Sequence, residues 1–260
     1  MKKLFLALLA TISVPAMAMT AEQIMQKVDQ IKEPASMKAN MTMVLVDSKG
    51  KQRVRSMQSI SADIDGVDKS LMFFLEPSDV KGTGFLMFDY AAAEQDDDQW
   101  MFLPSLKKAK RIASGDKTGS FMGSDFSYSD MSKRNLDEWT YKLLKEDDLN
   151  GVKVWVIEST PVNDAVIEKT GYTKSIAYVR QDNFHVTRGI SYLQKKGEVK
   201  LMNIGSFVEI GDYWLATETQ MVSQKNGQTV HRTLMKIENI EVDIDASADD
   251  FTLTRLEQGL

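Results

Sequence analysis

Residues 36–75, SMKANMTMVLVDSKGKQRVRSMQSISADIDGVDKSLMFFL, decide the fold class. From Ser36 onward apolar and polar side chains alternate, which is the period of a β-strand with two different faces. The turn DSKG at residues 47–50 is followed by a second run at residues 51–62, so the sequence predicts a β-hairpin. Residues 70–75, SLMFFL, hold apolar side chains in succession, and we expect both faces of that strand to be covered.

Runs of the same kind follow along the chain and are joined by short turns such as Asn150-Gly151 and Asn226-Gly227. Parallel strands would need helices between them, and the pattern predicts none there. We therefore predict a mainly β fold, in which an antiparallel sheet of about 11–13 strands curls into a half-open barrel. The later predicted strands lie at residues 85–90, 100–103, 139–145, 153–160, 173–180, 185–195, 198–210, 213–223 and 229–243.

Little of the chain is predicted to be helical. Residues 20–32 carry apolar side chains at helical spacing, with Thr20 as the N-cap and Gln23 three residues later. Short helical turns are expected at residues 129–135 and 248–251. We expect the first helix to pack on the sheet and the short elements to act as lids. Such scarce helical material leaves the inside of a curled sheet for side chains or a ligand.

The first residues have the order of a secretory signal peptide. Lys2 and Lys3 precede an apolar run, and Ala16 and Ala18 form a small-residue cleavage site. We expect residues 1–18 to be cleaved, residues 19–260 to form a single domain, and the mature protein to be periplasmic. No later apolar run approaches the roughly 18 residues of a transmembrane helix.

Composition excludes several classes of protein. The chain has no cysteine, so it forms no disulfide, thiolate nucleophile or thiolate metal site. Its formal net charge is −5, and removal of Lys2 and Lys3 makes it two units more negative. This charge argues against nucleic acid and against general adhesion to an anionic membrane. Sixteen methionines are present, and methionine suits surfaces that accept varied apolar partners.

Residues 99–130, QWMFLPSLKKAKRIASGDKTGSFMGSDFSYSD, combine an apolar strand, a basic segment and a glycine-rich loop. The basic residues are Lys107, Lys108, Lys110 and Arg111. The loop places large apolar side chains among glycine, serine and aspartate, so we predict a mobile lid over the open side of the barrel. The lid residues that would face the cavity are Phe121, Met122 and Phe126, and the basic segment would lie at its rim.

Familiar catalytic and metal-binding patterns do not occur in the sequence. It has no Gly-x-Ser-x-Gly elbow and no His-Glu-x-x-His motif. Residues 94–98, EQDDD, lack the alternating ligands of a calcium loop, and we interpret them as a solvated acidic loop. Residues 115–119, GDKTG, lack the order of a phosphate loop. Asp125 and Asp130 are suited to cap the helical turn near them. We expect no enzymatic activity, no cofactor and no metal.

Several blocks resemble the LolA-like family often called the outer membrane lipoprotein-sorting proteins. They are FLEP at 74–77, KG at 81–82, WMFLP at 100–104, KKAKR at 107–111 and SFMGSDF at 120–126, the last being the most specific. The resemblance covers essentially the whole mature chain. It implies a half-open barrel like LolA and LolB, with helices over an apolar cavity, and carriage of a lipid-modified protein or a lipid across the periplasm. It also implies partnership with an inner-membrane exporter of the resistance-nodulation-division type.

Two hypotheses for the function follow. The first is a non-enzymatic, monomeric carrier that holds acyl chains in an apolar cavity and contacts membranes transiently. Alternation assigns the cavity lining to Met41, Met43, Leu45, Phe73, Phe85, Met87, Trp100 and Phe102. The second is an accessory subunit of such an exporter, with a filled core, docked through the basic segment. That segment equally suits a solvated edge strand that lysines protect from pairing.

Overall fold

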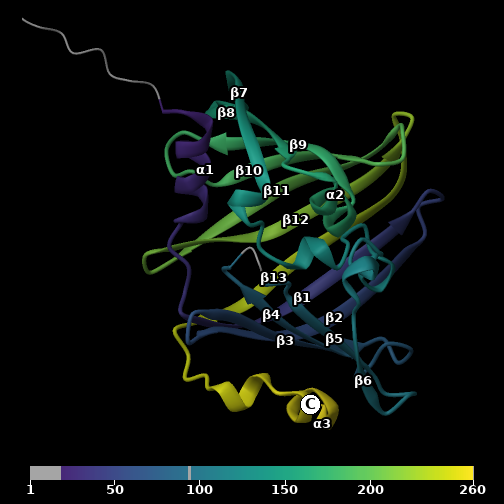
Figure 1. Ribbon diagram of the computed structural model, residues 1–260. Coiled ribbons are helices and arrows are strands. Elements are labelled where there is room, and N and C mark those ends of the chain that lie inside the picture. The colour runs from purple at the N-terminus through teal and green to yellow at the C-terminus, as the bar shows by residue number, and fades with distance from the viewer. Residues whose placement is uncertain (1–18, 93–94, 260) are drawn as a thin grey trace, which may run out of the picture.

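The computed structural model describes residues 19–92 and 95–259, and the signal peptide expected at residues 1–18 lies outside the described residues. The described chain consists mainly of one antiparallel sheet that curls around an inner, concave face (Figure 1). The predicted mainly β fold, with a curled open sheet and an N-terminal helix, is therefore confirmed. None of the helices in these ranges is long and apolar enough to cross a membrane.

Thirteen strands of the described chain form the sheet in the order β6-β5-β4-β3-β2-β1-β13-β12-β11-β10-β9-β8-β7. Strands β1 to β6 step outward from the middle of the sheet to one edge. Strands β7 to β13 step from the other edge back to the middle, where β13 pairs with β1. The bounds are β1 Ser36–Asp47, β2 Gln52–Ile64, β3 Val67–Glu76, β4 Gly84–Tyr90, β5 Asp98–Leu103, β6 Lys108–Arg111, β7 Trp139–Leu149, β8 Val152–Pro161, β9 Tyr172–Arg180, β10 Val186–Leu193, β11 Glu198–Ile210, β12 Tyr213–Lys225 and β13 Gln228–Val242.

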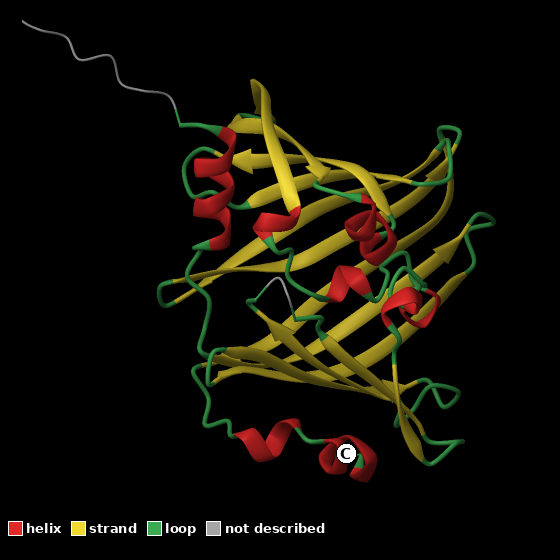
Figure 2. Cartoon of the chain, viewed as in Figure 1, coloured by secondary structure: helices red, strands yellow, loops and turns green. Residues whose placement is uncertain are grey.

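Helices are short and lie on both faces of the sheet (Figure 2). The backbone N–H of Gln23 donates to Thr20 Oγ1 at 3.2 Å, which confirms the predicted cap of the first helix. Alternation does not predict α2, which Asn163 caps between β8 and β9. The α-helices are α1 Ala21–Asp29, α2 Asp164–Thr170 and α3 Leu253–Gln258, and the 3₁₀ turns are η1 Ser114–Asp116, η2 Phe121–Gly123, η3 Ser129–Met131, η4 Leu136–Glu138 and η5 Ala248–Phe251.

The N-terminal helix covers one end of the concave face. Its buried Ile24 and Met25 pack with Ile157 of β8 and Val179 of β9. The sheet side chains at this contact are fully buried. The helix is short, so its stability comes mainly from this packing rather than from its own propensity.

The strands of the β1–β5 half are covered on both faces, as expected for residues 70–75. On the outer face, η5 and α3 bury Phe251 and Leu256 against Leu71 and Phe73. Helix α3 approaches β4 closely at Gly84, where an added Cβ would lie 2.5 Å from Leu256 Cδ1. On the inner face, the side chains that alternate with these, such as Phe74 and Phe85, pack against the segment that connects β6 to β7.

The outer cover can be tested by truncating its buried aromatic ring. Phe251→Ala should lower the free energy of unfolding by about 3–5 kcal/mol, because a fully buried phenylalanine is removed. Leu253→Ala, at the start of the adjacent helix α3 and 44% exposed, should change it by at most about 0.5 kcal/mol. Urea denaturation followed by tryptophan fluorescence measures both, and equal effects would show that Phe251 does not anchor the cover.

Candidate functional site

The segment at residues 112–138, called here the crossing segment, lies over the concave face (Figure 2). It connects β6 to β7, which are the two opposite edges of the sheet. Short 3₁₀ turns and bends replace regular structure along it. Glycine supports one tight turn, since Gly123 has a φ of 73° in the left-handed region.

Phe121 is the apolar centre of the crossing segment. Its side chain is 0% exposed. Its ring centroid lies 5.1 Å from that of Phe85 and 5.6 Å from that of Tyr128, both in edge-to-face arrangements, and 6.2 Å from that of Phe74. Such aromatic pairs add to the stability already gained from buried area.

The concave face brings together five of the predicted lining residues and all three predicted lid residues in one cluster: Met41, Met43, Leu45, Phe85 and Met87 from the sheet, and Phe121, Met122 and Phe126 from the crossing segment. Phe121 and Phe126 are buried, and Met122 is partly buried. The sheet side chains share this face because their strands pair in register, as Met43 does with Met235.

Three of the predicted lining residues face the other way. Phe73, Trp100 and Phe102 belong to the outer cluster that the C-terminal elements cover. Phe73 and Phe102 are both opposite Gly84 in register, whereas Trp100 is opposite Leu86. These strands are apolar on both faces, so alternation alone did not indicate which face is concave, and the assignment of these three was wrong.

Other lining residues were missed by the sequence reasoning. Phe74, Met221 and Met235 are buried in the concave cluster, and so is Met57. Met57 lies opposite Met41 on one neighbouring strand and Phe74 on the other. The signal that could have found them is methionine at alternate positions of strands that pair in sequence order.

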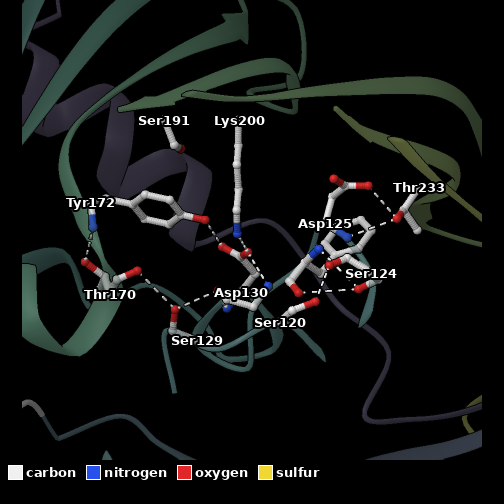
Figure 3. Close-up of polar contacts among 12 residues, drawn as sticks. Ser120, Ser124, Asp125, Ser129, Asp130, Thr170, Tyr172, Ser191, Lys200 and Thr233 are labelled. Atoms are coloured by element: carbon white, nitrogen blue, oxygen red, sulfur yellow. Dashed lines mark hydrogen bonds and ion pairs between the residues drawn. The ribbon is translucent and has the colours of Figure 1, made fainter. Parts of the chain in front are cut away.

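Two carboxylates fasten the crossing segment to the β8–β13 half of the sheet (Figure 3). Asp125, only 4% exposed, accepts from Thr233 Oγ1 at 2.7 Å, and His231 Nδ1 lies 2.7 Å from the same Oδ2 atom. Two partners on β13 therefore compensate the burial of this carboxylate.

Asp130 makes the second attachment. It accepts from the hydroxyl of Tyr172 at 2.7 Å and from Nζ of Lys200 at 3.0 Å (Figure 3). It also accepts from the backbone N–H of Ser127 at 2.7 Å, whereas η3 itself has no side-chain cap, so the capping role expected from the sequence was wrong. Asp130 therefore both shapes the segment and ties it to β9 and β11.

The β1–β5 half holds the same segment through its backbone. Nη1 of Arg55 donates to the carbonyl of Met122. Nε2 of Gln99 donates to the carbonyl of Tyr128 at 2.9 Å. Because these donors come from β2 and β5, the segment is hydrogen-bonded to both halves of the sheet.

An apolar pocket opens beside the cluster. Its volume is about 270 Å³, and its lining includes Met87 and Met131, which also belong to the concave cluster. Leu215, Asp89 and Lys133 line it as well. Part of the methionine-rich surface is thus accessible next to the crossing segment.

The acidic residues after β4 differ from the solvated loop that the sequence predicted. Asp96 is exposed, but Asp97 is only 7% exposed and accepts from the backbone N–H of Tyr90 at 3.2 Å. Asp98 already belongs to β5. The expectation was wrong for Asp97 because this carboxylate caps the end of a strand instead of pointing to water.

The basic segment lies at one free edge of the sheet. Lys108 and Lys110 are exposed on β6, and Lys107 is exposed in the turn before it. Arg111 Nε donates to Asp98 Oδ1 at 2.8 Å, so this residue is tied to the neighbouring strand. Within residues 19–92 and 95–259, no three histidine, aspartate or glutamate residues are grouped so as to hold a metal ion.

Comparison with known proteins identifies the family. A family model described as an uncharacterized protein matches residues 66–258, which is more than half of the chain. The chain belongs to this family, and its structural neighbours include an outer membrane lipoprotein-sorting protein domain and a LolA superfamily protein. No curated protein matches the chain.

Three solved structures cover nearly the whole fold. A domain from Vibrio parahaemolyticus, described as an outer membrane lipoprotein-sorting protein, is 29% identical with a TM-score of 0.82, over 91% of this chain and 98% of that one. A DUF1329 family protein from Desulfovibrio piger is 28% identical with a TM-score of 0.83, over 91% and 97%. A LolA superfamily protein from Nitrosomonas europaea shares the fold at 20% identity, with a TM-score of 0.68 over 90% and 98%.

Asp89 should make the stability of the protein depend on pH. Burial is the main cause that raises the pKa of this carboxyl to about 7. The nearby carboxylates Asp97 and Asp68 act in the same direction, and the hydrogen bond donated by the backbone of Lys133 acts against them. A raised pKa means that the folded state binds the proton more tightly. The contribution of Asp89 to the free energy of unfolding is therefore fully present below the pKa of the unfolded state, 3.8. It is lost as the pH rises through about 7.

Asp89→Asn should remove this loss of stability at high pH. The neutral amide oxygen still accepts from the backbone N–H of Lys133 and does not become charged. Urea denaturation at pH 5 and pH 8 measures the difference between the variant and the wild type. Asp96→Asn, at an exposed position, is the control. A pH dependence that is the same in all three proteins would contradict the assignment to Asp89.

Proposed function

We propose that this protein is a non-enzymatic carrier that holds a lipid, or the acyl chains of a lipoprotein, on its concave face. The observation that carries the proposal is the concentration of methionine there. Four buried and seven partly buried methionines belong to the concave cluster. A surface of flexible, polarizable side chains accepts acyl chains of different length and shape.

Burial of acyl chains supplies the affinity in this proposal. Each methylene moved from water to an apolar surface contributes about 0.8 kcal/mol, so one or two chains bind well without a specific polar contact. The family relationship supports the same class of cargo, because the Vibrio neighbour is described as a lipoprotein-sorting protein. Transport across the periplasm, with residues 1–18 as the signal peptide and residues 19–260 as a single carrier domain, is part of the proposal.

The crossing segment is the competitor of the cargo. Phe121 and Phe126 occupy the apolar surface that acyl chains would cover. Cargo binding therefore requires these side chains to leave the concave face, and their own burial sets the free energy of that step. In this proposal the segment acts as a lid that fills the site when cargo is absent.

Phe121→Ala tests this competition. The smaller side chain weakens the closed state, so the affinity for a fluorescent fatty acid should rise by about tenfold or more. Phe251→Ala is the matched control, since it truncates an equally buried ring on the outer face and should leave the affinity unchanged. If Phe121→Ala fails to fold, Phe121→Leu gives a smaller change in the same direction.

The carrier proposal fails if no lipid is found by native mass spectrometry of the purified protein and no fluorescent fatty acid binds to it. It also fails in its lid mechanism if Phe121→Ala and Phe251→Ala change the affinity equally.

An accessory role beside an exporter is the second candidate. The observation in its favour is the exposure of Lys107, Lys108 and Lys110 at the free edge formed by β6. Such an edge offers positive charge to a partner, and Glu257 of α3 already accepts from the backbone N–H of Ala109 at 2.9 Å. The partner in this candidate is an inner-membrane exporter of the resistance-nodulation-division type.

Reversal of these three charges separates the two candidates. Lys107→Glu, Lys108→Glu and Lys110→Glu together should reduce cross-linking to the exporter and leave fatty acid binding intact, because these three side chains are exposed and do not belong to the concave cluster. Arg111 is left unchanged, because it pairs with Asp98 and its reversal would break that ion pair. Cross-linking that does not change would leave the basic segment as a solvated edge strand.

A further inference from the structure

Arg134, at the end of the crossing segment, has only neutral partners. Its guanidinium lies 3.9 Å from the ring centroid of Trp139, and its Nη2 donates to Ser175 Oγ at 3.1 Å. Among the ion pairs of the described residues none includes Arg134, although Lys133 and Lys169 each have carboxylate partners. Burial lowers the pKa of the Arg134 guanidinium, as expected where a positive charge is incompletely compensated.

Trp139 provides an independent second observation. It is 4% exposed, and its indole Nε1–H is buried without a hydrogen-bond partner. Buried donors in folded proteins are nearly always paired, and one that is not requires an explanation. The stacked pair therefore combines a cation without an ion-pair partner and an unsatisfied donor.

Both side chains line a polar pocket of about 160 Å³. Its carboxylates are already engaged: Asp130 accepts from Lys200 and Tyr172, and Glu138 pairs with Lys169. The cations that line it are Lys117, Lys133, Arg134 and Lys169, and the acids are Asp97, Asp130 and Glu138. The lining thus carries one more positive than negative charge.

We propose that Arg134 and the indole N–H of Trp139 bind a phosphate group in this pocket. A guanidinium donates through several N–H groups in a fixed fork that matches the oxygens of a phosphate. A bound phosphate supplies both the missing negative charge and the missing acceptor. The surrounding lysines add favourable potential without being its direct partners.

The phosphate has two sources, free phosphate and a lipid headgroup. Lys133 lines this pocket and also the apolar pocket with Met87 and Met131. An anionic lipid with its acyl chain on the methionine-rich surface would therefore place its headgroup beside Arg134. This lipid source rests on the proposed function, whereas binding of free phosphate does not.

Titration of the mature protein with inorganic phosphate tests the site directly. The indole N–H signal of Trp139 in a ¹H–¹⁵N spectrum, assigned with Trp139→Phe, should move downfield as the donor gains an acceptor. Arg134→Gln should weaken phosphate binding by about tenfold or more. Arg188→Gln is the matched control, because Arg188 also lies over an aromatic ring, that of Tyr178, and bonds to Asn203 on the outer face.

Two short-chain lipids distinguish the sources. Dihexanoyl phosphatidic acid and dihexanoylglycerol share their acyl chains and differ in the phosphate. The wild type should bind the phosphatidic acid about tenfold more tightly, and Arg134→Gln should remove that preference while leaving dihexanoylglycerol binding unchanged. Phosphate binding without lipid binding would support the site with free phosphate as its ligand and would overturn the carrier function.

The proposal is overturned if neither inorganic phosphate nor phosphatidic acid moves the Trp139 signal. It is also overturned if Arg188→Gln has the same effect as Arg134→Gln, or if Arg134→Gln weakens both lipids equally. In these cases binding of dihexanoylglycerol would still support the carrier function, so the two failures are distinguishable.

Discussion

The chain must cross its own concave face because β6 and β7 are successive strands at opposite edges of the sheet. Once the first half of the chain steps outward from the middle and the second half steps back, the connection between them has to span the open side. This follows from connectivity and holds for any loop sequence. The sequence of residues 112–138 decides only which groups are placed over that face.

The side chains placed there divide into apolar groups and carboxylates. Phe121 packs against Phe74 and Phe85, and this contact is apolar and non-directional. Asp125 and Asp130 meet donors on β9, β11 and β13, where the geometry is specific. Buried carboxylates are tolerated only with such partners, so they set the position of the segment.

This division is suited to a cover that is exchanged for a ligand. Apolar contacts can be replaced by acyl chains at little cost, because one apolar partner substitutes for another on a flexible methionine surface. Polar contacts cannot be replaced in this way and return the segment to one place. The outer face has no such competitor, because η5 and α3 cover it with packing that includes the close approach at Gly84.

The sequence by itself determined the elements and their order. Alternation, turn residues and a capped first helix predict the antiparallel sheet, and the block SFMGSDF indicates the family. Only the tertiary structure decided which face of a strand is concave when both are apolar, so Phe73 and Phe102 were misplaced. The path of the crossing segment over the sheet likewise brought Arg134 to Ser175 of β9. Such neighbours are far apart in the chain, and local periodicity carries no information about contacts that only register and curvature create.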